Sequence, residues 1–346
     1  MTKILFLSFI YLLSSCSRSP TINLHTRTFG ENPKNVIWIQ LPGFELEHAA
    51  LLRFGLNDSR QLSSMEDVDC VGSAWSYNFY QLRTDASDSA LSQITGSADI
   101  RNSCPSENRY PVWQYYKSLG YQTYAIEAGT SDGNSLIQHE SCNKKTFLEG
   151  LTLLQMRSAS TKDKDPSFFH YQSQKKIDKE ALYFDQTCQN SKSGCFATLS
   201  NNIQSMWSEN IDQTKSSFFY IRDFRYLNYL KNGDIKNARE ILSEINKVIS
   251  FFKSQPNAAQ TLILVTGGET QSLRLPTQGK EWEAFEKLGK NVKLERSRLN
   301  SPVLAKGPSA ENFCGVYEES KILSRHFWRD DSKVFSIDKI TELMKF

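Results

Sequence analysis

The sequence predicts an α/β sandwich in which a mixed, mainly parallel central sheet carries helices on both faces. Two apolar runs, residues 36–41 and 261–265, are typical of strands that are buried on both sides. A further strand at 217–223 is followed by an amphipathic helix at 235–252 and then by the second of these runs. The order strand, helix, strand indicates a parallel crossover, which places the helix against one face of the sheet.

Start and stop signals support the other elements. In residues 84–96, Asp85 or Ser87 is a suitable N-cap and Gly96 a natural C-terminal stop, so a helix is expected between them. Residues 111–119 predict a second helix that ends before a glycine, and residues 121–126 predict the next strand. Residues 71–82 are aromatic and extended in character, residues 44–56 predict a short helix or loop, and the charged run 280–298 predicts an exposed helix or loop.

Length and charge limit the possible functions. The chain has 346 residues, which is enough for one large domain with a substantial core. Its formal net charge is only +3, and the basic residues form no stripe, so we expect no nucleic-acid partner. Aromatic residues make up 12% of the chain, and we expect them in the core and along an open cleft.

The first residues predict export and a lipid anchor. Lys3 precedes a short apolar stretch that ends in Leu13-Ser14-Ser15-Cys16, and this segment is too short to span a bilayer. The ending resembles the lipobox of bacterial lipoproteins, in which Cys16 is acylated after cleavage; an ordinary signal peptide with an incidental cysteine is the alternative. We therefore expect a signal peptide at 1–15, a tether at 16–34, and a domain at 35–346 with a polar insertion at about 140–210. Because Ser17 follows the cysteine, we expect the outer membrane of a bacterial cell envelope.

The cysteine count favours disulfides over a metal site. Of seven cysteines, six remain once Cys16 is assigned to the anchor, and an even number in an exported protein indicates pairing. Cys188 and Cys195 are close in sequence and are expected to pair, whereas the other four cannot be assigned. No cysteines show the two-residue spacing of zinc sites.

Six segments in order resemble the alkaline phosphatase superfamily, in particular its sulfatase-like branch. They are, from the N-terminus, VIWIQLPGF, TDASDSALSQITG, LGYQTYAIEAG, FFYIRDFRYLN, TLILVTGGET and SPVLAKGPSAENFCGVYEESKIL. The resemblance implies a three-layer fold whose active site lies at the carboxyl ends of the sheet strands. It also implies hydrolysis of phosphate or sulfate esters by bound metal ions and a side-chain nucleophile.

The resemblance also implies which positions would carry that chemistry. Several of these positions hold residues whose side chains can neither bind a metal nor act as a nucleophile. The metal-binding aspartate of the first strand falls on Pro42, and the Asp-His pair of the late strand falls on Gly267-Gly268. The nucleophile falls on Ala86, which Thr84 and Ser87 flank as replacements if the register shifts.

Few candidate metal ligands remain under this resemblance, chiefly Asp223 and Glu269. Asp223 matches a ligand aspartate, but its histidine partner is missing, and capping of a nearby amide is the alternative role for its carboxylate. Glu269 follows the double glycine, where it can replace the lost aspartate, and His48 and Glu45 can join it in a remodelled metal site. His326 lies near the position of a late family ligand but is expected to pack beside Trp328.

These observations predict a lipid-anchored envelope protein whose sulfatase-like domain has lost metal-dependent hydrolysis and needs no cofactor. Its cleft is expected to bind an anionic, glycan or lipid-headgroup ligand through Arg222, Asp223, Arg225 and Glu269, since arginine pairs well with anions. One alternative is an active phosphate- or sulfate-ester hydrolase with a non-standard divalent metal site; another is a purely structural envelope lipoprotein. The expected cleft walls are Pro42, Gly43, Phe44, Thr84, Ser87, Arg222, Asp223, Arg225, Gly267, Gly268 and Glu269.

Overall fold

The computed structural model describes most of the chain between residues 32 and 327. The described residues are 32–53, 63–102, 104–105, 109–129, 135–139, 147–160, 166–173, 176–178, 180–188, 194–288 and 291–327. The predicted signal peptide, the anchor residue Cys16 and nearly all of the tether lie outside them. No helix in the described part is long and apolar enough to cross a membrane.

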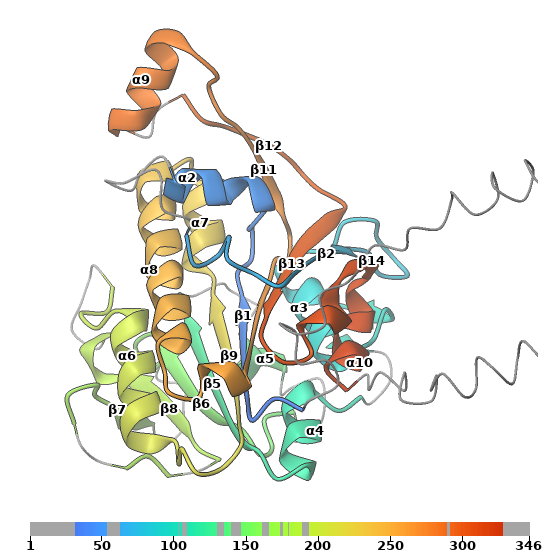
Figure 1. Cartoon of the computed structure of the whole chain (residues 1–346), viewed down its shortest axis with the longest axis vertical. Coiled ribbons are helices and arrows are strands. Elements are labelled where there is room, and N and C mark those ends of the chain that lie inside the picture. Colours follow the sequence, from blue (N-terminus) through green and yellow to red (C-terminus); the bar gives the residue numbers. More distant parts are fainter. Residues whose placement is uncertain are drawn as a thin grey trace, which may run out of the picture.

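A ten-stranded mixed sheet forms the centre of the molecule (Figure 1), in the order β14-β2-β13-β10-β1-β9-β5-β6-β8-β7. The middle strands β10, β1, β9, β5, β6 and β8 are parallel, while β13 is antiparallel to β10 and to β2. The strands are β1 (Asn35–Gln40), β2 (Cys70–Trp75), β5 (Gln122–Ala128), β6 (Thr152–Met156), β7 (Ser167–Phe169), β8 (Leu182–Asp185), β9 (Ser217–Asp223), β10 (Thr261–Thr266), β13 (Asn300–Lys306) and β14 (Gly315–Glu318).

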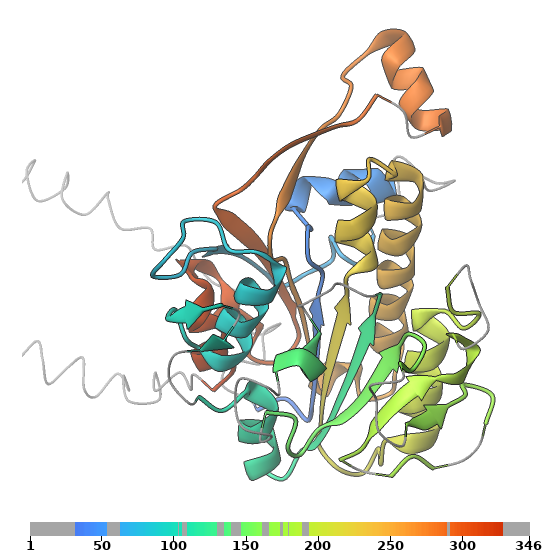
Figure 2. The same ribbon diagram turned by 180° about the vertical axis from the view of Figure 1, so that it is seen from behind.

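Side chains alternate along the strands and divide the core into two layers. In β9, Phe219 and Ile221 belong to one apolar cluster, whereas Phe218 and Tyr220 belong to the other. The first cluster contains residues of α2 (Ala49–Arg53), α6 (Leu199–Ser205) and α8 (Ile235–Lys253). The second contains residues of α3 (Ala86–Thr95), α4 (Val112–Ser118), α5 (Leu136–His139) and α10 (Ile322–His326). The ribbon of these helices is seen from behind in Figure 2. The predicted fold class, a three-layer sandwich with a mainly parallel sheet, is thus confirmed.

Local sequence signals explain the elements next to the strand ends. Asp85 caps α3 by accepting from the amides of Ser87 and Asp88, and Gly96 ends it in the left-handed conformation. Asp234 caps α8 through the amide of Asn237, as expected, and the apolar stripe of α8 is buried. α7 (Arg225–Lys231) follows β9 directly.

Two regions contain strands that the sequence did not predict. The stretch expected as a polar insertion supplies β6, β7, β8 and α6, so it forms one end of the central sheet. The charged run 280–298, expected as an exposed helix or loop, contains the helix α9 (Gly279–Leu288) and also a strand, β12 (Lys293–Ser297). β12 pairs with β11 (Gln271–Arg274), and these elements extend beyond the end of the sheet (Figures 1 and 2). Short elements complete the described fold: β3 (Ile100–Arg101), β4 (Cys104–Pro105), η2 (Leu46–His48), η3 (Gln186–Cys188), η4 (Met206–Asn210), η5 (Ala258–Gln260), η6 (Ala310–Phe313) and η7 (Glu319–Lys321).

Disulfides join distant and neighbouring parts of the chain. Cys188 pairs with Cys195, as the sequence predicts. Cys70, at the start of β2, pairs with Cys314, just before β14, across a sequence separation of 244 residues. Cys104 is also disulfide-bonded.

Candidate functional site

The carboxyl ends of the parallel strands bring the sequence-predicted residues to one edge of the sheet. β1, β9 and β10 run side by side in register, so the turns that follow them are neighbours. The turn after β1 is bonded to the turn after β10, because the Gly43 amide donates to the Gly268 carbonyl at 2.7 Å. Open α/β sheets place their ligand sites at such an edge.

The first residue of α3 is the point where two of the predicted residues meet. The Ala86 amide donates to Glu269 Oε2 at 3.0 Å, and Arg222 Nη2 donates to the Ala86 carbonyl at 2.9 Å. A carboxylate at a helix N-terminus is favoured by the helix dipole. Thr84 and Ser87, which flank Ala86, are both buried. Thr84 Oγ1 has no hydrogen-bond partner among the described residues.

Glu269 is held from two sides. Its Oε1 atom pairs with Lys231 Nζ at 2.5 Å, while Oε2 accepts from α3. Its side chain is 16% exposed, and its φ of 45° lies in the left-handed region, which is uncommon for a residue with a side chain. Lys231, at the end of α7, was not among the sequence-predicted site residues.

Arg222 and Asp223 point to opposite faces of the sheet, because neighbouring strand residues alternate. Arg222 is fully buried, bonds to Glu127 Oε1 at 3.3 Å, and lies over the ring of Phe224 at 4.2 Å. Asp223 is also fully buried, but its carboxylate contacts α7 and not α3. The structure therefore brings Arg222 and Glu269 together at Ala86 and places Asp223 in a separate group.

That separate group is an ion-pair network with Arg225 in its centre. Arg225 Nη2 contacts Asp223 Oδ2 at 2.6 Å and Glu244 Oε2 at 2.9 Å, and Arg225 Nε contacts Asp223 Oδ1 at 3.0 Å. The Arg225 amide also donates to Asp223 Oδ1 at 2.9 Å. The sequence alternative for Asp223, a carboxylate that binds a nearby amide, thus matches one of its contacts.

The two glycines after β10 lie against neighbouring atoms. A Cβ at Gly267 would lie 2.8 Å from the Phe44 carbonyl oxygen and 3.0 Å from Pro302 Cδ. A Cβ at Gly268 would lie 2.8 Å from Ser89 Oγ. We call this region, with Gly267, Gly268, Phe44, Ser89 and Pro302, the closed end of the edge.

Beneath the closed end lies a buried carboxylate that the sequence did not single out. Glu319 accepts from Ser76 Oγ at 2.6 Å, from Ser89 Oγ at 2.8 Å and from Gln93 Nε2 at 3.1 Å. Gln93 Nε2 also donates to the Gly267 carbonyl at 2.8 Å. Burial raises the pKa of Glu319 to about 7, and no cationic side chain of the described residues pairs with it. Ser76, Ser89 and Gln93 are more than 200 positions away from Glu319 in sequence, so no local pattern could have found this cluster.

His48 and His326, the two histidines considered as metal ligands from the sequence, are buried among rings and hydroxyls. His48 Nδ1 lies 2.7 Å from the Tyr226 hydroxyl, and His326 Nδ1 lies 3.1 Å from the Tyr116 hydroxyl. Burial lowers the pKa of each ring to about 3, so both are neutral at pH 7. Glu45, the other residue expected near the edge, pairs with Arg298 at 2.9 Å.

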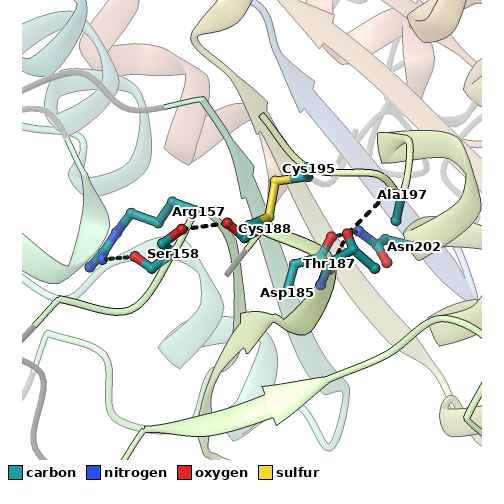
Figure 3. The surroundings of a disulfide bond; sticks show 8 residues. All are labelled: Arg157, Ser158, Asp185, Thr187, Cys188, Cys195, Ala197 and Asn202. Carbon is teal, nitrogen blue, oxygen red and sulfur yellow. Dashed lines mark hydrogen bonds between the residues drawn. A yellow bond between two sulfur atoms is a disulfide. The ribbon is translucent and has the colours of Figure 1, made fainter. Parts of the chain in front are cut away.

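Among the described residues, one group of three acidic, cysteine or histidine side chains is close enough to share an ion: Asp185, Cys188 and Cys195. Its two sulfur atoms are joined in a disulfide, and Asp185 accepts from Thr187 and Asn202 (Figure 3). A disulfide sulfur cannot act as a thiolate ligand, so this group does not have the chemistry of a zinc site.

Bacterial alkaline phosphatases of known structure share this architecture. The enzyme of the Antarctic bacterium TAB5 aligns with a TM-score of 0.62 and 14% identity over 86% of this chain and 98% of its own. The cold-active enzyme of a Shewanella species gives 0.64 and 14% over 84% and 98%. The Thermus thermophilus enzyme gives 0.65 and 11% over 89% and 94%.

At such low identity these similarities establish the fold, and the chain has the mixed α/β fold of alkaline phosphatases. No protein-family model and no curated protein matches the sequence. The order of six segments noted in the sequence therefore predicted the fold correctly.

Proposed function

We propose that this chain is a lipid-anchored cell-envelope protein whose alkaline-phosphatase-like domain has lost metal-dependent ester hydrolysis and binds an anionic, glycan or lipid-headgroup ligand. The observation that carries the proposal is the packing of Gly267 and Gly268. In the family that the sequence resembles, this position holds an Asp-His pair, and here a Cβ at either residue would meet an atom at 2.8 Å. The closed end thus lacks the ligands, and at Gly267, where the nearby atom is a backbone carbonyl oxygen, it also lacks the space for a side chain.

The remaining acidic residues are committed to other partners, which supports the same conclusion. A divalent cation needs several oxygen or nitrogen ligands with available lone pairs. Asp223 is bound by the guanidinium and the amide of Arg225, and Glu269 is bound by Lys231 and α3. Asp223 is bound at the first residue of α7, whereas Glu269 is bound at the last residue of α7 and at α3, so each carboxylate already has its own cationic partner and the two do not fit a shared metal site.

A direct test combines metal analysis with turnover. The full chain, dialysed against zinc and magnesium salts, should retain less than about 0.1 equivalent of either metal and should not hydrolyse p-nitrophenyl phosphate or sulfate. One tightly held equivalent, together with turnover that a chelator abolishes, would establish the active hydrolase instead.

One observation favours that hydrolase as the second candidate. Thr84 Oγ1 is buried beside α3 and has no hydrogen-bond partner among the described residues. The family's nucleophile position falls on Ala86, so the Thr84 hydroxyl is the expected nucleophile if the alignment of this segment with the family shifts by two residues. If turnover is found, Thr84→Ala should abolish it, whereas Thr95→Ala, on the last turn of α3, should not.

The anchor is supported by the sequence Leu13-Ser14-Ser15-Cys16 alone, since these residues lie outside the described structure. We propose that Cys16 carries palmitate or a similar acyl chain and holds the protein at the outer membrane. Metabolic labelling with radioactive palmitate should mark the wild-type chain and not Cys16→Ala. Labelling that persists in the variant would place the acyl chain elsewhere.

A further inference from the structure

A pocket opens at the same sheet edge as the closed end, but beside the neighbouring strands. Within the described residues it has a volume of about 440 Å³ and lies at the carboxyl ends of β5 and β6. Its walls include Met156, Arg157, Arg225, Tyr229 and the disulfide Cys188–Cys195. This volume lies in the range of pockets that hold small molecules. We call it the β5–β6 pocket.

Arg225 is the most strongly oriented group in this pocket. Its Nε and Nη2 atoms are held by Asp223 and Glu244, which fixes the plane of the guanidinium. Its Nη1 atom has no hydrogen-bond partner in the part of the chain that the structure describes, and the side chain is 25% exposed. A guanidinium fixed along one edge and unpartnered at Nη1 is arranged in advance to donate to an anionic oxygen.

Two further groups complete the polar side of the pocket. The Tyr229 hydroxyl forms no hydrogen bond to any described residue, so it is available as a second donor. Arg157 lies over the Phe184 ring at 4.8 Å and donates to the Ser158 carbonyl at 2.9 Å. Figure 3 shows Ser158 between Arg157 and the disulfide: its hydroxyl donates to the Cys188 carbonyl, and the Arg157 guanidinium is directed away from the sulfur atoms.

We propose that the β5–β6 pocket binds a small molecule that carries an oxyanion, namely a phosphate, sulfate or carboxylate group. The anionic oxygens accept from Arg225 Nη1 and Tyr229, and the rest of the molecule packs against Met156 and the disulfide. This assignment rests on the ligand-binding part of the proposed function and places the ligand beside, and not within, the region that corresponds to the metal centre. The negative charges of Asp223 and Glu244 balance the positive charges of Arg157 and Arg225. The affinity of the pocket for the anion therefore depends on directed hydrogen bonds more than on net charge.

The test measures binding of non-hydrolysable probes to the full chain by calorimetry. The probes are phenylphosphonate, benzenesulfonate and benzoate, with benzyl alcohol as the neutral match. We expect at least one oxyanion to bind at one site per chain and benzyl alcohol not to bind. The ranking of the three oxyanions identifies the natural group.

Substitutions then locate the site. Arg225 is unsuitable because its loss leaves Asp223 and Glu244 without a counter-charge, so Tyr229→Phe and Arg157→Gln are used. Tyr229→Phe should weaken binding about tenfold, since a hydrogen bond to a charged group is worth roughly 1.5–3 kcal/mol. Arg157→Gln should weaken binding less, because Arg157 lines the pocket but donates no hydrogen bond to the anion. The matched controls Tyr110→Phe and Arg101→Gln, an exposed tyrosine and a surface arginine outside the pocket walls, should bind as the wild type does.

Each alternative result overturns the assignment. If no oxyanion binds to the native chain, the pocket is not an oxyanion site. If an oxyanion binds, but Glu269→Gln changes its affinity and Tyr229→Phe and Arg157→Gln do not, the ligand lies at α3 and the binding function survives without this pocket. The metal and turnover measurements decide the loss of hydrolysis independently of both results.

Discussion

The closed end and the β5–β6 pocket lie on the same sheet edge but handle charge in different ways. Beneath the closed end, the buried carboxylate of Glu319 is surrounded by hydroxyl and amide donors. At the pocket, Arg225 joins two carboxylates and is partly exposed. The comparison teaches that one region satisfies its polar groups internally, whereas the other keeps donors that face solvent. Binding is therefore expected at the second region.

The largest effect on stability is expected from replacing Arg225, the arginine of the pocket that pairs with Asp223 and Glu244. Arg225→Met leaves Asp223 buried without its partner, and breaking such a pair costs about 3–5 kcal/mol of unfolding free energy. Urea unfolding at pH 7 measures this. Arg101→Met, a surface arginine that stacks on Tyr80, is the control and should change stability by less than about 1 kcal/mol. Equal losses in both variants would show that Arg225 does not hold the pocket together.

Glu319 should make the closed end sensitive to pH. The folded pKa of about 7 lies above the ordinary 4.5, so the folded state retains the proton more strongly. Its contribution to stability is complete below pH 4.5 and is lost as the pH rises to about 7. Glu319→Gln should therefore be more stable than wild type at pH 8, by up to about 3 kcal/mol, and nearly unchanged relative to it at pH 4. If the stability difference between Glu319→Gln and wild type were the same at pH 4 and pH 8, Glu319 would not have a raised pKa in the folded state.

The glycines of the closed end provide the next test. Gly267→Ala should cost about 1–3 kcal/mol, because the new Cβ meets a backbone carbonyl that cannot rotate away. Gly268→Ala should cost less, because its Cβ meets the Ser89 hydroxyl, which is a side-chain atom. Thermal unfolding of the two variants compares them directly. If both alanines are tolerated, the closed end has room for larger side chains, and the argument from packing fails.

The smallest effect is expected at the Lys231–Glu269 pair. Lys231 is 48% exposed, so the pair is screened by solvent, and Lys231→Met should change stability by less than about 1 kcal/mol. Raising the salt concentration should reduce the difference further. A larger loss would mean that Lys231 positions Glu269 at α3 and that this contact, more than the glycines, keeps the edge closed.

The sequence predicted the regular parts of the fold well, because their signals are local. The stripe of α8 and its cap Asp234 lie within one helix, and the central strands are continuous apolar runs. The strands towards the β14 end of the sheet were less visible. β2 contains Gly72, and its exposed positions include Val71 and Trp75, so it does not follow a simple alternation of polar and apolar residues.

The site was only partly predictable for a different reason. The sequence shows six segments in the family's order, and that order assigns the family's metal and nucleophile positions to Pro42, Ala86 and the double glycine. The contacts of Glu319 with Ser76 and Ser89 depend on how distant segments pack, and the sequence gives no signal for them. The sequence grouped Arg222, Asp223 and Arg225 because they lie at or just after the end of β9, but the alternation along the strand separates the contacts of Arg222 from those of Asp223 and Arg225.

The Cys70–Cys314 bond has a consequence for chain integrity. It closes a covalent ring that contains every strand of the main sheet except β1 and β14. A protease cut anywhere within the ring leaves both pieces tied together, whereas a cut between Gln40 and Cys70 detaches the central strand β1 from all covalent restraint. In a simple chain-entropy model, so long a loop contributes about 5 kcal/mol. A reducing agent should therefore convert a nicked but intact domain into separable fragments.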